Sequence, residues 1–227
     1  RRPIWSLIAL GLGLAVAPAG AAEAKLYEMR TYHAAPGKAE AMHARFRDDA
    51  CALLKKHAMK AIGFWVPMDE ADGAKDTMMW VLEWPDRETR EKAWEAFKAD
   101  PEWQAAFKES EKGGKLVERA EVHFLRATDF SPAPQVSSSP SPRAFELRTY
   151  TAEAGRLGAL LARFRDHTVK LFEKHGMTNF AYWTLDEGQE GADATLVYML
   201  AHANREAAKA SFDAFRADPD WVRSEEH

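Results

Sequence analysis

The chain has 227 residues, of which 46% are hydrophobic and 29% are charged, with a formal net charge of −4 and one cysteine. This length allows one large domain or two small ones, and the composition excludes wholesale disorder and a multi-span membrane protein. A mildly acidic chain is unsuited to coating nucleic acid, so no nucleic-acid partner is expected. The single Cys51 excludes an internal disulfide and a multi-cysteine zinc site.

Residues 1–24 have the pattern of a secretory signal peptide. Two arginines precede an apolar stretch from Ile4 to Ala17, and small residues follow up to Ala24. The apolar stretch is short for a membrane span. We therefore expect an exported protein, periplasmic or secreted, with no membrane contact after cleavage. An uncleaved N-terminal anchor is the alternative, and the arginine pair leaves the choice between the general and the twin-arginine export route open.

The remaining chain contains one unit twice, at a constant offset of 118 residues. The segment YEMRTY at 27–32 returns as FELRTY at 145–150, and 29 of the 77 positions are identical between 27–103 and 145–221. A segment rich in serine and proline, 131–143, separates the copies and is typical of an extended linker. These limits predict one domain over 25–130 and a second over 144–227.

The second copy stops soon after Trp221, which is equivalent to Trp103, whereas the first copy continues to Phe130. We therefore expect the second copy to lack its last strand, which roughly 20 further C-terminal residues would supply. The alternative is that the second copy evolved without this strand, although that would leave an open sheet edge.

The elements of the first copy follow from its periodicity. Alternation predicts a strand over 25–33, and apolar residues at steps of three and four predict a helix from a turn at Pro36-Gly37 to His57. Strands are expected over 60–68 and 77–84, followed by a helix that Asp86 caps and that breaks near Asp100-Pro101. A last strand is expected over 118–128. The order βαββαβ is the ferredoxin-like arrangement, with an antiparallel sheet and helices on one face.

With one bare sheet face in each copy, the two copies are expected to cover each other as a pseudo-dimer with approximate two-fold symmetry. The fold class is therefore α+β: two tandem ferredoxin-like domains packed sheet-to-sheet within one chain, the second without its last strand. Formation of a homo-oligomer is left open.

Four features of both copies resemble the NIPSNAP family: an E-x-R-x-Y opening strand, a long helix ending in K-H-x-M, a tryptophan on the second strand and an A-D-P-x-W helix. The resemblance implies a dimeric α/β barrel of the ferredoxin-like superfamily. Family members have no settled biochemical activity, and eukaryotic relatives are mitochondrial interaction platforms in organelle quality control. The wider superfamily includes cofactor-free monooxygenases, lactone isomerases and haem enzymes. The export signal departs from the eukaryotic relatives and puts the mitochondrial role in doubt.

The opening strand carries the main candidate site residues. Alternation puts Glu28, Arg30 and Tyr32 on one face, and Glu146, Arg148 and Tyr150 on the matching face of the second copy. We predict that these polar faces point into the space between the two sheets, because the apolar faces should take the helices. In a functional interpretation an arginine holds an anionic or carbonyl group and a tyrosine supplies a hydroxyl. In a structural interpretation a Glu–Arg bridge fixes how the halves dock.

The other candidates are two histidines and two tryptophans. His57 and His175 end their helices, where each could be a general base, a haem ligand, or a packed ring stabilised by the helix dipole. Trp65 and Trp183 could form the floor of an aromatic pocket, or they could be packed in the hydrophobic core. Motifs for zinc, haem attachment and phosphate binding are absent from the sequence. We therefore expect no metal and no cofactor.

Two functions remain open, and the sequence does not decide whether the protein is an enzyme. The first is a non-catalytic exported module that binds a small molecule or a protein partner. The second is a cofactor-free oxygenase or isomerase acting in a cleft lined by the Glu–Arg–Tyr face of either copy. A deep wet cavity reached by Arg30, Tyr32 and His57 would favour the enzyme, and an Arg30 tied to Glu28 would favour the binding module.

Overall fold

The computed structural model describes residues 25–134 and 143–225. The expected signal peptide and most of the expected linker lie outside these residues. In copy one the elements are β1 (Leu26–Ala34), α1 (Ala39–Arg45), a π-helical turn η1 (Phe46–Ala50), α2 (Cys51–Lys56), β2 (Lys60–Trp65), η2 (Glu70–Asp72), β3 (Thr77–Trp84), α3 (Arg87–Ala99), α4 (Pro101–Ser110) and β4 (Val117–Ala127).

Copy two repeats these elements up to its second helical pair. They are β5 (Ala144–Thr151), α5 (Leu157–Arg163), a π-helical turn η3 (Phe164–Thr168), α6 (Val169–Lys174), β6 (Thr178–Leu185), β7 (Thr195–His202), α7 (Arg205–Arg216) and α8 (Pro219–Glu225). The expected order βαββαβ is therefore confirmed in copy one, and the described residues of copy two show this order up to the second helical pair. The helix break is confirmed at Asp100-Pro101, and the Asp86 side chain caps α3 by accepting a hydrogen bond from the Thr89 amide at 2.6 Å.

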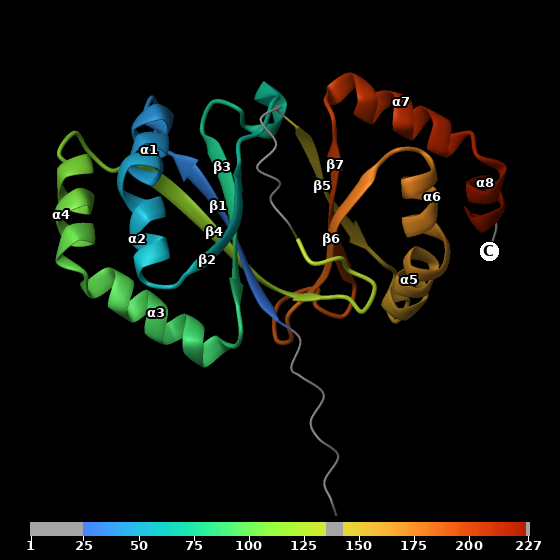
Figure 1. Cartoon of the computed structure of the whole chain (residues 1–227), viewed down its shortest axis with the longest axis horizontal. Coiled ribbons are helices and arrows are strands. Elements are labelled where there is room, and N and C mark those ends of the chain that lie inside the picture. Colours follow the sequence, from blue (N-terminus) through green and yellow to red (C-terminus); the bar gives the residue numbers. More distant parts are fainter. Residues whose placement is uncertain (1–24, 135–142, 226–227) are drawn as a thin grey trace, which may run out of the picture.

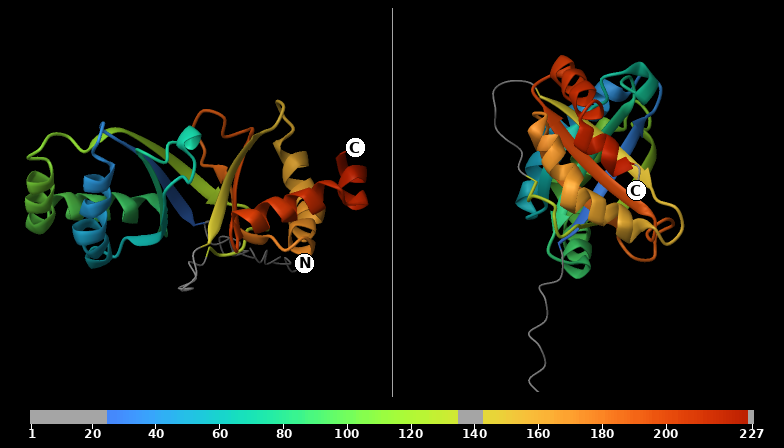
Figure 2. Two further views of the ribbon diagram at one scale, coloured as in Figure 1. Left: turned by 90° about the horizontal axis from the view of Figure 1, so that it is seen from above. Right: turned by 90° about the vertical axis from the view of Figure 1, so that its right-hand side faces the viewer.

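The seven strands form one sheet in the order β2-β3-β1-β4-β6-β7-β5, and every neighbouring pair is antiparallel. The strand β4 joins the copies, because Leu125 pairs with Leu185 and Ala127 with Trp183. The helices of copy one cover one end of the molecule and those of copy two the other, with the strands between them (Figures 1 and 2). β2 and β5 are the two ends of the sheet.

Three hydrophobic cores fill this frame. Residues such as Met42 and Trp80 form a core between the sheet and the helices of copy one, and Phe164 and Tyr198 belong to the equivalent core of copy two. The third core lies between the halves and is built by both of them, from β1, β2, β3, β4, β6 and β7. The halves are therefore held by shared apolar burial as well as by the β4–β6 pairing.

The prediction for the faces of the opening strand is wrong. Tyr27 and Met29 lie in the core between the halves, whereas Tyr32 packs with Trp80 in the core under the helices of copy one. Glu28 and its neighbours on that face therefore point toward the helices. Both faces of β1 are buried, and the charge of Glu28 is compensated by a helix residue that alternation along the strand cannot reveal.

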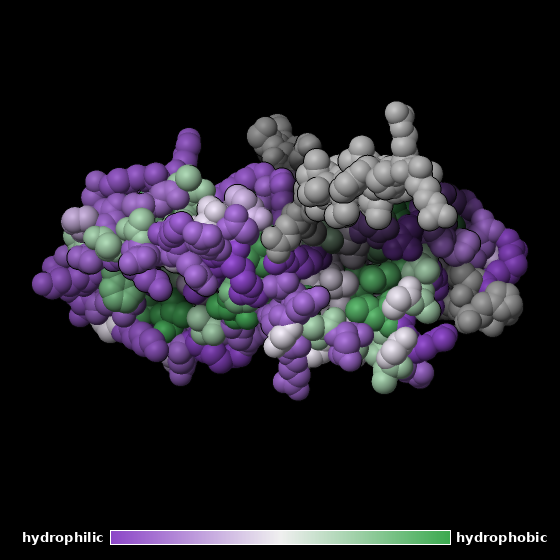
Figure 3. Space-filling view, turned by 90° about the horizontal axis from the view of Figure 1, so that it is seen from below, coloured by the Kyte–Doolittle hydropathy of each residue, from purple (hydrophilic) through white to green (hydrophobic). Residues whose placement is uncertain are grey.

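The face shown in Figure 3 is mostly hydrophilic, with apolar patches in both halves of the molecule. Among the described residues, no helix is both long and apolar enough to cross a bilayer.

Candidate functional site

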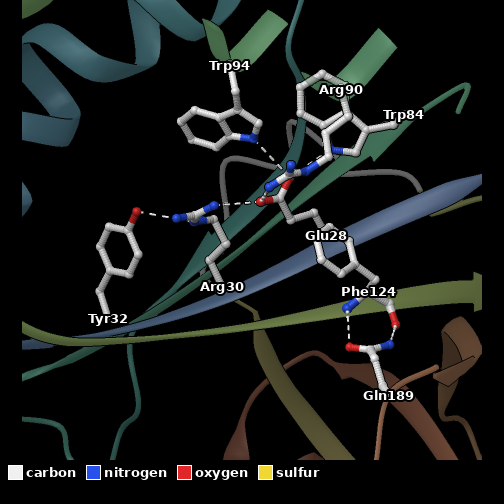
Figure 4. A network of polar contacts seen from close by, with 8 residues as sticks. All are labelled: Glu28, Arg30, Tyr32, Trp84, Arg90, Trp94, Phe124 and Gln189. Carbon is white, nitrogen blue, oxygen red and sulfur yellow. Dashed lines mark hydrogen bonds and ion pairs between the residues drawn. The ribbon is translucent and has the colours of Figure 1, made fainter. Parts of the chain in front are cut away.

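The carboxylate of Glu28 lies buried between β1 and α3 with its charge fully paired (Figure 4). Arg90 donates to its two oxygens, from Nε and Nη2, at 2.9 Å each. Arg30 Nη1 donates at 2.5 Å, and the indole N–H groups of Trp84 and Trp94 each donate at 3.0 Å. Burial alone would raise the pKa of Glu28, but the hydrogen bonds from Arg90 and Trp94 and the charge of Arg30 hold this pKa below its usual value.

The remaining members of this network are also satisfied. Arg30 donates from Nε to the Tyr32 hydroxyl at 3.2 Å and lies 4.7 Å from the Trp94 ring centroid. Arg90 Cζ lies 4.9 Å from the Phe124 ring centroid, and the Gln189 side chain of copy two makes two hydrogen bonds to the Phe124 backbone, at 2.9 and 2.6 Å. In copy one the Glu–Arg–Tyr face is therefore a structural clasp that fixes α3 on the sheet.

The clasp makes stability depend on pH in the acid range. The pKa of Glu28 is lower in the folded chain than the usual value of 4.5, so its contribution is complete above that value and is lost as the pH falls through the folded pKa. We expect the free energy of unfolding to fall as the pH drops below about 4.5, and to fall less steeply in Glu28→Gln. Urea unfolding from pH 7 to pH 3 measures both slopes, and equal slopes would contradict the role of Glu28.

Copy two keeps Glu146, Arg148 and Tyr150 but loses the three donors that saturate Glu28. The positions equivalent to Trp84, Arg90 and Trp94 hold residues that cannot replace that set: His202, Ala208 and Phe212. Glu146 keeps the Arg148 guanidinium, with Nε at 2.7 Å, while the His202 ring nitrogen Nε2 lies 3.7 Å away. The Glu146 side chain is 33% exposed, whereas that of Glu28 is fully buried. In copy one, Phe124 of β4 lies opposite Glu28 in the β1–β4 register. No described strand takes the equivalent place beside Glu146 on β5.

Arg148 is held as a cation beside a cavity. Its Cζ lies 4.2 Å from the Phe212 ring centroid, and its Nη1 is 3.4 Å from the Tyr150 hydroxyl. Burial would lower the pKa of Arg148, but the contacts with Tyr150 and Glu146 outweigh it and raise that pKa. The guanidinium therefore stays charged at any physiological pH.

The cavity measures ≈ 340 Å³ and has aromatic walls with two guanidinium groups. It is lined by Arg148, Tyr150, Phe164, Thr168, Phe172, Phe212, Phe215, Arg216 and Trp221. Arg216 Nη2 pairs with Asp213 at 2.6 Å, whereas among the described residues the hydrogen bond of Arg148 Nη1 is the long contact with Tyr150, at 3.4 Å. Such a site can hold an oxygen atom of a ligand on Arg148 and an apolar or aromatic body against the rings.

A second hydroxyl lies behind this site. Tyr198 replaces Trp80 of copy one, and its ring centroid lies 5.3 Å from that of Tyr150. Its hydroxyl is buried and makes no hydrogen bond of ordinary geometry. Burial raises the pKa of Tyr198, so the hydroxyl remains a proton donor. The neighbouring Tyr150 hydroxyl also contributes to this shift, so the two hydroxyl groups interact with each other.

The predicted histidines do not reach this site. His57 Nε2 lies 2.7 Å from Asp100 Oδ2, and His175 makes the same contact with Asp218 at 2.7 Å. Asp100 also caps α4 by accepting the Glu102 amide hydrogen bond at 2.8 Å. Each histidine therefore ties the end of one helix to the corner between two others, and neither lines the cavity.

The predicted tryptophans lie on the opposite side of the sheet. Trp183 is fully buried in the core between the halves, with its ring 5.7 Å from that of Tyr27. Trp65 makes the equivalent contact with Phe145, also at 5.7 Å. The structure therefore brings together Glu146, Arg148 and Tyr150 and separates them from both tryptophans. In the described ranges no group of three or more His, Cys, Asp or Glu side chains is placed to hold a metal ion.

Sequence reasoning missed Tyr198, His202 and Phe212. The signal that could have found them is the pattern of differences between the copies, since these positions and Ala208 are where copy two departs from the aromatic and basic residues of copy one.

Comparison with known proteins identifies the family of the chain and solved structures that are similar to it. The NIPSNAP family model matches residues 27–132 and 145–227. An uncharacterized NIPSNAP-like domain protein from Burkholderia xenovorans has 22% identity and a TM-score of 0.43, over 51% of this chain and 96% of its own. A protein from Lactobacillus acidophilus described as a "putative monooxygenase" has 13% identity and a TM-score of 0.57, over 90% of this chain and 87% of its own. A protein from Fusobacterium nucleatum with the same description has 9% identity and a TM-score of 0.57, over 88% and 83%.

The two monooxygenase-labelled structures share the fold over nearly the whole chain, which supports a ferredoxin-like α+β architecture. No protein with a curated description matches. Because the family model accounts for most of both copies, the chain belongs to the NIPSNAP family, whose biochemical activity is uncharacterized.

Proposed function

We propose that this protein binds a small molecule in copy two, and that the ligand combines an oxyanion or carbonyl oxygen with a flat apolar body. The observation that carries the proposal is the charged Arg148 beside an aromatic cavity of ≈ 340 Å³. Its Nη1 lies 3.4 Å from the Tyr150 hydroxyl, and both residues line the cavity. A guanidinium paired with a hydroxyl suits a carboxylate or an enolate oxygen.

Copy one supports this assignment by contrast. Its equivalent cavity measures ≈ 230 Å³ and includes Tyr32 but not Arg30 among its lining residues. Arg30 is already committed to Glu28, which also holds Arg90. A ligand would have to break a saturated buried network in copy one, whereas in copy two it displaces only a long contact.

The experiment is calorimetric titration of the protein with cinnamate, a planar aromatic carboxylate. We expect one saturable site per chain, affinity weakened roughly 10–100-fold in Arg148→Met, and weak binding of the neutral cinnamamide. Arg165→Met is the matched control, because Arg165 lies on the surface and pairs with Asp129 at 2.8 Å. Equal binding by wild type and Arg148→Met, or equal affinity for acid and amide, would overturn the proposal.

A cofactor-free oxygenase or isomerase acting at the same cavity is the second candidate. It is favoured by the whole-chain fold neighbours described as monooxygenases. Arg148 and Tyr150 would then stabilise the anion of an activated substrate. Recovery of a bound compound after incubation in air separates the two functions: an unchanged compound supports binding, and an oxygenated or isomerised product supports catalysis.

Architecture, localisation and assembly complete the proposal. We propose that the two units form an intrachain version of a dimeric α/β barrel, supported by the shared core and the β4–β6 pairing. We also propose export to the periplasm or beyond, on the sequence of residues 1–24 alone. A protein partner or self-association remains compatible with a non-catalytic module.

A further inference from the structure

His202, at the end of β7, is a buried histidine beside the Glu–Arg pair of copy two. Its side chain is 1% exposed, and neither ring nitrogen makes a hydrogen bond of ordinary geometry with a described residue. Nε2 lies 3.7 Å from Glu146 Oε2, and the Phe212 ring packs against the imidazole with 5.9 Å between the ring centroids. An imidazole titrates near neutral pH, so this ring is either a neutral group without close partners or a cation beside a carboxylate.

Copy one has donors that do not titrate near neutral pH at the same place. Trp84, equivalent to His202, donates its indole N–H to Glu28 at 3.0 Å. Arg90, equivalent to Ala208, donates to both oxygens of Glu28. Copy two therefore has one titratable group where copy one has an indole and a permanent cation.

The net charge of the copy-two site depends on this ring. Burial raises the pKa of Glu146, but its contacts with His202 and Arg148 outweigh burial and hold that pKa below its usual value, so the carboxylate is negative at neutral pH. With a neutral imidazole, the charges of Glu146 and Arg148 offset each other. With a protonated imidazole, the site has one net positive charge, as copy one does because Arg90 is its second cation.

The helix α7 brings no other charge to the imidazole. The charged residues in its first half are exposed: Arg205, Glu206 and Lys209. Arg205 pairs with Asp69 of copy one, and Lys209 pairs with Asp213 of the same helix. The α7 side chain that packs on the imidazole is the uncharged Phe212. The Glu–Arg pair of β5 is therefore the charged neighbour that responds when the ring takes up a proton.

We propose that His202 couples the binding of a carboxylate at Arg148 to the uptake of one proton. The proton comes from the solvent and stays on the imidazole, which then pairs with Glu146. The added positive charge stabilises a carboxylate bound to Arg148, whereas with a neutral imidazole the charge of Glu146 opposes its binding. His202 does not line the cavity and acts through Glu146, so it is a positioning residue. The inference rests on the proposed function and adds that the anionic ligand enters together with a proton.

The test is calorimetric titration with cinnamate at pH 8.5 and pH 6.0, which both lie above the range near pH 4 where carboxylic acids titrate. We expect the wild type to bind about 10-fold more tightly at pH 6.0. Near neutral pH, binding should also take up a proton, which makes the measured heat depend on the ionisation enthalpy of the buffer. His202→Gln should bind equally at both pH values, with the affinity of the wild type at pH 8.5. His167→Gln is the matched control, because His167 is exposed on η3 and its loss should leave the pH dependence unchanged.

A second measurement needs no ligand. The imidazole carbon chemical shifts of His202 report its protonation directly. Glu146→Gln removes the carboxylate that favours the cation, so this variant should lower the pH at which the imidazole takes up its proton. Titration of His202 at the same pH in both proteins would overturn the pairing on which the coupling depends.

The outcomes separate this inference from the proposed function. An affinity that does not change with pH, or a pH dependence that persists in His202→Gln, would overturn the coupling and leave binding at Arg148 intact. Cinnamate binding that is equal in the wild type and Arg148→Met would overturn the proposed function, and the coupling with it.

Discussion

Glu28→Gln is expected to lower the free energy of unfolding by about 3–5 kcal/mol. The substitution removes the negative charge that compensates Arg30 and Arg90 and leaves two guanidinium groups partly buried without a counter-ion. It also replaces one carboxylate oxygen by an NH2 group, which faces N–H donors whichever way the amide is turned. Urea unfolding at pH 7, followed by circular dichroism, measures the loss.

The repeat supplies a matched control for this prediction. Glu146→Gln removes the same group from the same strand position, but Glu146 is one-third exposed and contacts one guanidinium, that of Arg148. We expect it to cost less than about 1 kcal/mol. Similar losses for the two variants would contradict the conclusion that only copy one uses this face as a clasp.

Trp183→Ala is expected to cost about 3–5 kcal/mol, because it empties a fully buried site in the core between the halves. The loss should reach both copies, since Trp183 of copy two packs on Tyr27 of copy one. Hydrogen exchange should therefore show faster opening of β1 as well as of β6. Protection of β1 unchanged from the wild type would mean that the copies have independent cores.

Trp65→Ala is the control for this second prediction. Trp65 makes the equivalent ring contact, but it is half-buried at the open edge of the sheet. Its replacement should cost at most about 2 kcal/mol. A cost equal to that of Trp183→Ala would show that the two edges are equally closed in solution.

Sequence periodicity predicted the helices and strands well because the same unit occurs twice in the chain, so that each pattern could be checked against its copy. The strand over 77–84, the helix break before Pro101 and the antiparallel order all follow from patterns that recur at one offset. The π-helical turns η1 and η3 were not predicted. Each inserts one extra residue per turn in the middle of a helix, and an apolar pattern at steps of three and four tolerates that change.

The orientation of the opening strand could not be predicted in the same way. Alternation tells which residues share a face, but it does not tell which face meets the helices. The rule that charged faces avoid the core failed at Glu28 because Arg90 and Trp94, more than 60 residues away, neutralise and solvate its carboxylate. Long-range compensation of this kind leaves no local pattern in the sequence.

Only part of the candidate site could be predicted from the sequence, namely its strand residues. The strand residues Arg148 and Tyr150 were identified as site residues because their types repeat. What distinguishes copy two from copy one is the loss of partners at His202, Ala208 and Phe212, which matters only once α7 is seen to cover β5 and β7. The histidine–aspartate pairs could not be predicted, because the partner aspartates lie 43 residues further along the chain.

These differences suggest a division of labour after duplication. Copy one closes its polar face into a clasp that holds α3 on the sheet, and copy two keeps the same Glu–Arg–Tyr triplet with an aromatic cavity beside it. The shared core joins the two copies. We therefore propose that the same fold unit serves stability in copy one and binding in copy two.

Backbone amide chemical shifts recorded during titration with cinnamate test whether only copy two binds the ligand. We expect the perturbed amides to cluster around Arg148 and Tyr150 of β5 and Phe212 of α7, while the amides of the equivalent Arg30, Tyr32 and Trp94 do not shift. Perturbations of equal size in both copies, or confined to β1 and α3, would contradict it.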